Sequence, residues 1–204
     1  MIVSTPLDLP KIQPDSWDKF WDIWNKYAEP LVKVGMNTAT SPAPVGSVSV
    51  WHGLDIFKQP YGYTYWSAPY YDTSSILPNF HEAILGAGFG RLFRVRVLMS
   101  HLNVTSHTDD NADKWQARAF LHYTSDKQQW YFTRPGDAKG ERTYLSMPED
   151  TNWFTYNDKF CWHGTDFDPN HKKVLLQIYS GDGVSPDLLE RSLEKYKDYT
   201  ISYD

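Results

Sequence analysis

Short segments with the composition of β-strands dominate the chain from Arg91 to about residue 181. Turn-forming stretches such as RPGDAKGE and DFDPNH separate these segments. The segments are rich in branched and aromatic residues, which fit a pleated, half-buried surface. Several such strands in succession favour a β-sandwich or jelly roll over a parallel sheet. The predicted strands are 91–99, 116–124, 128–133, 143–147 and 172–179, with a further strand around 48–51.

A long amphipathic helix is predicted before this β-rich region. Between residues 15 and 34, aromatic and aliphatic residues recur at three- to four-residue spacing and form one apolar stripe. Asp15 or Ser16 provides the chemistry of its N-terminal cap. The stripe is typical of a helix that packs on the back of a sheet.

Two shorter helices are predicted as well. Asn79 is expected to cap a helix that runs to Leu85 and ends in the stretch GAGFG. A dinucleotide-binding loop opens a helix instead of closing one, so these glycines indicate a helix terminus. Ser185 precedes a proline and predicts the cap of a C-terminal helix over 185–199.

Length and composition indicate one domain, because a single core readily serves 204 residues. The expected organisation within 1–204 is a helical and loop support over 1–90, a β core over 91–181 and the C-terminal helix. A net charge of −5 argues against nucleic-acid and anionic membrane partners. The single cysteine excludes an internal disulfide and a cysteine-based zinc site. With no basic and apolar leader at its start, the chain is expected to be cytoplasmic.

One set of residues carries recognisable metal chemistry: His107-Thr-Asp109 and, 56 positions later, His163. In an extended segment, residues i and i+2 project to the same side, so His107 and Asp109 can reach one ion together. Two imidazoles and one carboxylate are the ligand set of non-haem Fe(II) oxygenases. This set leaves three positions for a bidentate co-substrate and O₂. A His-x-Asp tripeptide is common by chance, so the surrounding order of segments has to support it.

The stretch from about Leu77 to Asp187 supplies such an order. It contains a short helix, an arginine-bearing strand, the first metal-type histidine, an arginine-rich strand, an aromatic segment, a second histidine and a basic residue that opens a strand. The corresponding pieces are Leu77–Leu85, Arg91–Met99, His107–Asp109, Gln116–Arg118, Trp153–Asn157, His163-Gly164 and Lys173–Ile178. This order resembles the aspartyl/asparaginyl β-hydroxylase family of Fe(II)/2-oxoglutarate-dependent oxygenases, over a little more than half of the chain.

The resemblance implies a mostly β fold with flanking helices, built on a double-stranded β-helix of the jelly-roll or cupin-like type. It implies that His107, Asp109 and His163 are the catalytic iron ligands. The implied activity is a 2-oxoglutarate-dependent dioxygenase that uses Fe(II), 2-oxoglutarate and O₂. It hydroxylates an amino-acid side chain, either free or in a peptide, so its partner is a small-molecule or peptide substrate.

The same resemblance suggests residues for binding 2-oxoglutarate. Lys173 lies where the family places a basic residue on the distal carboxylate, with Lys172 as the neighbour that could replace it. The family has arginine there, and lysine binds as a point charge without the bidentate fork. Arg118 matches the arginine of the family's Arg-x-His, but Phe120 replaces the histidine. His122, two positions further on, is the candidate substitute.

Two other classes of protein fit the same residues. A mononuclear zinc hydrolase or lyase could use the same His-x-Asp…His set. A non-enzymatic jelly-roll binding module could present the aromatic run YGYTYWSAPYY over 61–71 to a sugar or peptide, although that run also fits a half-buried pair of strands.

Overall fold

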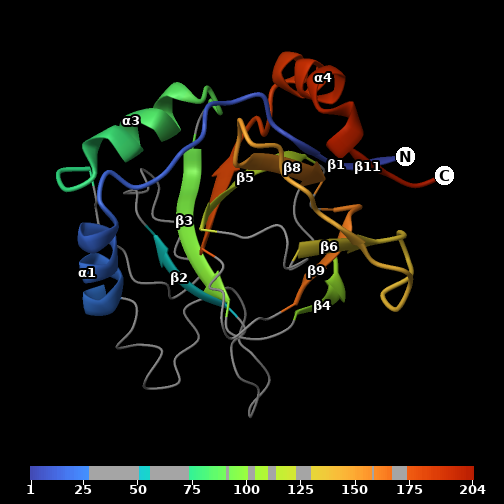
Figure 1. The fold of residues 1–204 in the computed structure, drawn as a ribbon, viewed down its shortest axis with the longest axis horizontal. Coiled ribbons are helices and arrows are strands. Elements are labelled where there is room, and N and C mark those ends of the chain that lie inside the picture. Colours follow the sequence, from blue (N-terminus) through green and yellow to red (C-terminus); the bar gives the residue numbers. More distant parts are fainter. Residues whose placement is uncertain are drawn as a thin grey trace, which may run out of the picture.

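Eight strands, β3 to β10, alternate between two antiparallel sheets that face each other (Figure 1). The computed structural model describes residues 1–27, 51–55, 74–90, 92–100, 104–109, 114–122, 130–157, 159–166 and 174–204. The eight strands are β3 (Leu92–Ser100), β4 (Val104–His107), β5 (Trp115–His122), β6 (Trp130–Thr133), β7 (Thr143–Tyr144), β8 (Trp153–Asn157), β9 (Trp162–Thr165) and β10 (Val174–Ser180).

The strand order defines a jelly roll. The larger sheet contains β8-β5-β10-β3 and the smaller sheet contains β4-β9-β6-β7. Strands that follow one another in sequence therefore cross from one sheet to the other, apart from the hairpin of β6 and β7, as in a double-stranded β-helix. This topology confirms the predicted fold class, a mostly β molecule with flanking helices.

Additional strands extend both edges of the larger sheet. β2 (Trp51–Asp55) pairs with β3, and β1 (Ile2–Pro6) pairs with β8. β11 (Ile201–Ser202) then pairs with β1, so both ends of the chain lie on one edge (Figure 1). Hydrogen bonds between Met1 and Tyr203 join these ends.

Because successive side chains of the central strands point to opposite faces of the larger sheet, the molecule has two hydrophobic cores. On β5, Ala117, Ala119 and Leu121 face outward, where helices cover the larger sheet. Phe120 and Arg118 belong to the opposite face, since successive side chains of a strand alternate. Phe120 joins residues of both sheets in the inner core: Val3, Trp130, Phe132, Leu145, Phe154, Tyr156, Cys161, Leu175 and Ile201. The strand pattern thus supplies an aromatic interior that contains, among the side chains that the structure describes, the buried Arg118.

Three helices cover the outer face of the larger sheet (Figure 1). They are α1 (Trp17–Tyr27), α3 (Pro78–Gly86) and α4 (Pro186–Lys195), and a 3₁₀ turn η2 (Lys197–Tyr199) follows α4. Ser16 caps α1, because its Oγ accepts a hydrogen bond from the Lys19 amide. Ser185 caps α4 in the same way, as predicted. The described part of α1 ends at Tyr27; the remainder of the predicted helix, 28–34, lies outside the described residues.

The cap of α3 differs from the prediction. Asn79 lies inside the helix, and Asp15 caps the helix from a distant segment. The carboxylate of Asp15 accepts hydrogen bonds from the amides of Asn79 and Phe80 at 3.1 and 2.9 Å. Sequence reasoning looks for caps next to the helix, whereas this cap is 64 positions away.

Several strand boundaries also differ. The predicted strand 143–147 is reduced to the two residues of β7, and the strand near 48–51 is observed as β2. The short strands β4, β8 and β9 were not predicted as strands. None of the helices that the structure describes is long and apolar enough to cross a bilayer.

Candidate metal centre

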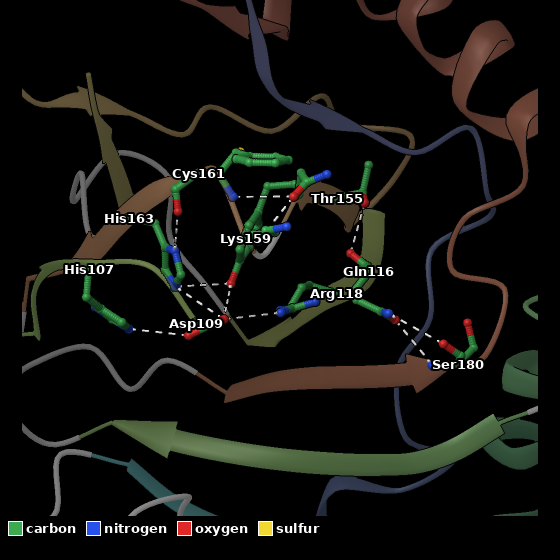
Figure 2. Close-up of polar contacts among 12 residues, drawn as sticks. His107, Asp109, Gln116, Arg118, Thr155, Lys159, Cys161, His163 and Ser180 are labelled. Atoms are coloured by element: carbon green, nitrogen blue, oxygen red, sulfur yellow. Dashed lines mark hydrogen bonds and ion pairs between the residues drawn. The ribbon is translucent and has the colours of Figure 1, made fainter. Parts of the chain in front are cut away.

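The side chains of His107, Asp109 and His163 point toward one another (Figure 2). His107 is the last residue of β4, and Asp109 follows it by two positions. His163 lies in β9, directly opposite His107 in the strand register. One ligating atom of each residue lies within 4.8 Å of the others. The register of two strands thus brings together the residues that the sequence placed 56 positions apart.

The distances within this group suit one metal ion. His107 Nε2 lies 3.4 Å from Asp109 Oδ1, and His163 Nε2 lies 3.6 Å from Asp109 Oδ2. Donor atoms that share an ion at about 2.1 Å lie roughly 3 to 3.5 Å apart. The donor set is that of Fe(II), Zn(II) and similar ions, so these three residues fit a metal.

His163 is held as a neutral imidazole. Its ring is buried, and Nδ1 lies 3.2 Å from the carbonyl oxygen of Cys161 (Figure 2). An Nδ1–H group that donates to this carbonyl leaves the lone pair of Nε2 directed toward Asp109. Burial lowers the pKa of His163 to about 4, with only partial opposition from Asp109. At neutral pH the imidazole is therefore uncharged, as metal binding requires.

Aromatic packing fixes the orientation of that ring. The Trp130 ring stacks on His163 with centroids 5.6 Å apart and an interplanar angle of 6°. Trp130 itself packs edge-to-face against Phe120 and Phe154 in the inner core. Because such cores are densely packed, the imidazole has little freedom to rotate.

Solvent reaches the centre from the side of His107. The His107 side chain is 42% exposed and that of Asp109 is 21% exposed, whereas His163 is almost fully covered. Burial alone would raise the pKa of Asp109, but His163, the hydrogen bond from His107 and the charge of Arg118 hold this pKa well below its usual range. The carboxylate is thus ionised and partly accessible.

Arg118 places a buried positive charge beside this carboxylate. Its side chain is fully buried, and Nη2 lies 3.5 Å from Asp109 Oδ2. The guanidinium also lies over the ring of Tyr156, 4.6 Å from the centroid. Arg118 and Asp109 balance each other's charge, which a buried ion requires.

Tyr156 is a further residue of the centre that sequence reasoning missed. Its hydroxyl lies 3.2 Å from His163 Nε2 and 3.4 Å from Asp109 Oδ2. A signal was present: Tyr156 follows Phe154 by two positions, so both face the same side of an extended segment. Recognising it required the segment Trp153–Asn157 to be identified as a strand.

The structure does not bring His122 to this group. His122 is exposed at the end of β5, with its ring against Trp17 at 6.1 Å. Four strand residues separate it from Arg118, a span of about 13 Å. Lys172 and Lys173 lie outside the described residues, as does the aromatic run over 61–71. The binding roles of these residues stay predictions.

The fold and this site define a class: a jelly-roll protein with a candidate metal centre of two histidines and one aspartate. No family model matches the chain. No curated protein matches it either. Among solved structures, the chain is similar to the non-heme alpha ketoglutarate dependent epimerase SnoN from nogalamycin biosynthesis, with 12% identity and a TM-score of 0.43 over 88% of this chain and 76% of that chain. A similarity this weak carries no functional conclusion, so the class rests on topology and side-chain geometry.

Proposed function

We propose that this protein is an Fe(II)/2-oxoglutarate-dependent dioxygenase, in accord with the resemblance of its sequence. The observation that carries the proposal is the convergence of His107, Asp109 and His163 in a jelly-roll fold. Two neutral imidazoles and one carboxylate leave room on an octahedral ion for a chelating co-substrate and O₂. The expected metal is therefore iron, held by these three side chains.

The charges around the centre support an anionic co-substrate. Without a metal, Asp109 and Arg118 cancel, and the pKa of His163 keeps its ring uncharged at neutral pH. A ferrous ion in this environment is balanced when a dianion such as 2-oxoglutarate binds with it, since uncompensated buried charge is costly. Arg118 lies inside the barrel and provides a fixed cation for one carboxylate. Lys173 is the proposed partner of the other.

The interior of the barrel supports chemistry that must exclude water. Trp130, Phe120 and Phe154 form a continuous aromatic layer beside His163. Such a lining limits side reactions of reactive oxygen species. The exposed side of His107 leaves an approach for substrate. In the proposed roles, the three ligands hold the iron, the aromatic layer keeps one side dry, and Arg118 orients the co-substrate.

Bound iron and 2-oxoglutarate supply the oxidising chemistry. In the net reaction, one atom of O₂ enters a substrate C–H bond and the other enters succinate, while 2-oxoglutarate loses CO₂. The sequence resemblance supports an amino-acid side chain, free or peptidyl, as the hydroxylated group. Products of a panel of amino acids and peptides, analysed for a mass gain of one oxygen atom, test this part separately.

The central test is a titration of 2-oxoglutarate into the anaerobic, Fe(II)-loaded protein. A visible charge-transfer band is expected, because the co-substrate chelates the iron, and this band should be lost in His107→Ala. Absence of the band in the wild type would overturn the proposal. If the natively purified protein instead contains zinc and ignores 2-oxoglutarate, the hydrolase or lyase alternative is favoured.

A further inference from the structure

The hydroxyl of Tyr156 occupies a position between two of the proposed metal ligands. It lies 3.2 Å from His163 Nε2 and 3.4 Å from Asp109 Oδ2. The tyrosine is 1% exposed, and its ring packs against Phe132 and Phe154 of the inner core. Because strand β8 and these rings fix the phenol, its hydroxyl is a built part of the centre.

The Tyr156 hydroxyl has one proton, and the acceptor of that proton determines its role. A phenol donates one hydrogen bond, and both neighbouring atoms are acceptors when Nδ1 of His163 carries the imidazole proton. Nε2 has only one lone pair, which a bound metal takes. Of these two acceptors, Asp109 is the one that stays open to the phenol in the metal-bound state, whereas in the metal-free state both are open to it.

Donors gather on one oxygen of Asp109. Arg118 Nη2 lies 3.5 Å from Oδ2, the same oxygen that Tyr156 reaches (Figure 2 shows Asp109 and Arg118). The other oxygen, Oδ1, faces His107 Nε2 at 3.4 Å. Oδ2 also lies 3.6 Å from His163 Nε2, but its two donors, Arg118 and Tyr156, make it less available to a metal than Oδ1.

From this geometry we infer that Tyr156 is a positioning residue that makes Asp109 bind the metal through one oxygen. The inference rests on the proposed function, since it assigns a role at the same metal centre. A carboxylate bound through both oxygens would occupy a second position on the ion. One-oxygen binding keeps that position open for the chelating co-substrate.

The test compares metal binding by Tyr156→Phe and by the wild-type protein, using Co(II) as a coloured probe. The substitution removes one oxygen atom and keeps the ring. We expect Co(II) affinity to fall about 10- to 100-fold, as on loss of an outer-shell partner. We also expect the visible Co(II) spectrum to change, because the carboxylate changes its binding mode. Tyr144→Phe is the matched control: its hydroxyl binds Asp166, 2.8 Å away, outside the centre.

A second measurement uses the wild-type protein and avoids any folding defect of the variant. Zn(II) is colourless, so ultraviolet difference spectra report on the aromatic side chains near the centre, in which the tyrosine bands are separated from those of Trp130 by their wavelength. We expect a tyrosine signal that saturates together with metal binding and persists in Tyr144→Phe. Thermal unfolding of the metal-free variants separates a purely structural role, which lowers stability and leaves the Co(II) spectrum unchanged.

The outcomes distinguish this inference from the proposed function. If the wild type binds metal and Tyr156→Phe shows the same affinity and Co(II) spectrum, the inference is wrong and the proposed function stands. A phenolate-to-metal charge-transfer band would also overturn it, because Tyr156 would then be a ligand. If the wild type binds neither Co(II) nor Fe(II), the proposed function fails and the inference fails with it.

Discussion

His107 and His163 face each other across strands β4 and β9 as register partners, with ring centroids 4.6 Å apart. Their relationship depends on the smaller sheet of the jelly roll and not on a local motif. The two histidines stay together only while β4 and β9 are paired. Because a metal would bind the paired state, metal binding should stabilise that pairing.

Replacement of a proposed ligand should abolish this mutual stabilisation. We expect Fe(II) or Co(II) to raise the unfolding temperature of the wild type and to have little effect on His163→Ala, because one of three donors is lost. The measurement is thermal unfolding with and without metal under anaerobic conditions. His122→Ala is the control for loss of a histidine, since His122 is exposed and packs against Trp17. An equal metal-induced shift in His163→Ala would contradict the ligand assignment.

Removal of the buried cation Arg118 should lower the stability of the metal-free protein. Arg118→Met keeps much of the side-chain volume and leaves Asp109 without its charge partner. We expect the free energy of unfolding of the metal-free protein to fall by about 2–3 kcal/mol, less than for a fully buried pair because Asp109 is partly exposed. Denaturant unfolding measures this change. An unchanged free energy of unfolding would show that the ion pair of Arg118 and Asp109 does not stabilise the protein.

Two adjacent lysines provide an internal comparison for co-substrate binding. We expect Lys173→Met to weaken 2-oxoglutarate binding at least tenfold and to leave Fe(II) affinity unchanged, because in its proposed role Lys173 pairs with the distal carboxylate and is no metal ligand. Lys172→Met is the matched control. Titration of the charge-transfer band measures both variants. A larger loss in Lys172→Met would transfer the role to that residue.

Asp15 should make the stability of the helical layer dependent on pH. Although burial opposes the effect, hydrogen bonds from the amides of Phe80 and Asn79 lower the pKa of Asp15 below its ordinary 3.8. A carboxyl with a depressed pKa in the folded state stabilises the protein fully above its unfolded pKa. This stabilisation is lost as the pH falls through the lower, folded value.

Asp15→Ala checks this contribution, which for a helix cap is about 1 kcal/mol near neutral pH. We expect the difference in unfolding free energy between wild type and variant to shrink below about pH 4. A difference that stays constant down to pH 2 would assign the effect of the substitution to packing.

The predictable parts of the molecule are those with a strong local pattern. The long strands β3, β5 and β10 and the caps Ser16 and Ser185 follow from residue types at short spacing. Strands β4 and β9 did not, since each has four residues and β9 contains glycine, which weakens a strand signal.

The residues of the candidate site also differ in whether a local pattern predicts them. His107 and Asp109 share a local motif, and a family-like order of segments linked them to His163. The contact of Tyr156 with His163 depends on how β8 packs against β9. Asp15 caps α3 although 64 positions separate it from Asn79. Such contacts arise from tertiary packing, which no window along the sequence contains. His122 shows the opposite error: a register shift between Phe120 and His122 interrupts the alternation along β5, so the His122 ring lies against Trp17 of the outer helical layer and not on the face of Arg118.

The position of β1 in the larger sheet, between β11 and β8, has a consequence for how the protein is made. Ser4 bonds the carbonyl of Thr155, 151 positions later in the chain. During synthesis β1 therefore leaves the ribosome long before its partner strand β8 exists. It must stay unpaired until β8 emerges. Closing so long a loop is slow, so the newly made chain passes through a period in which an unpaired strand is open to other chains. At high expression we therefore expect folding of this architecture to benefit from chaperones.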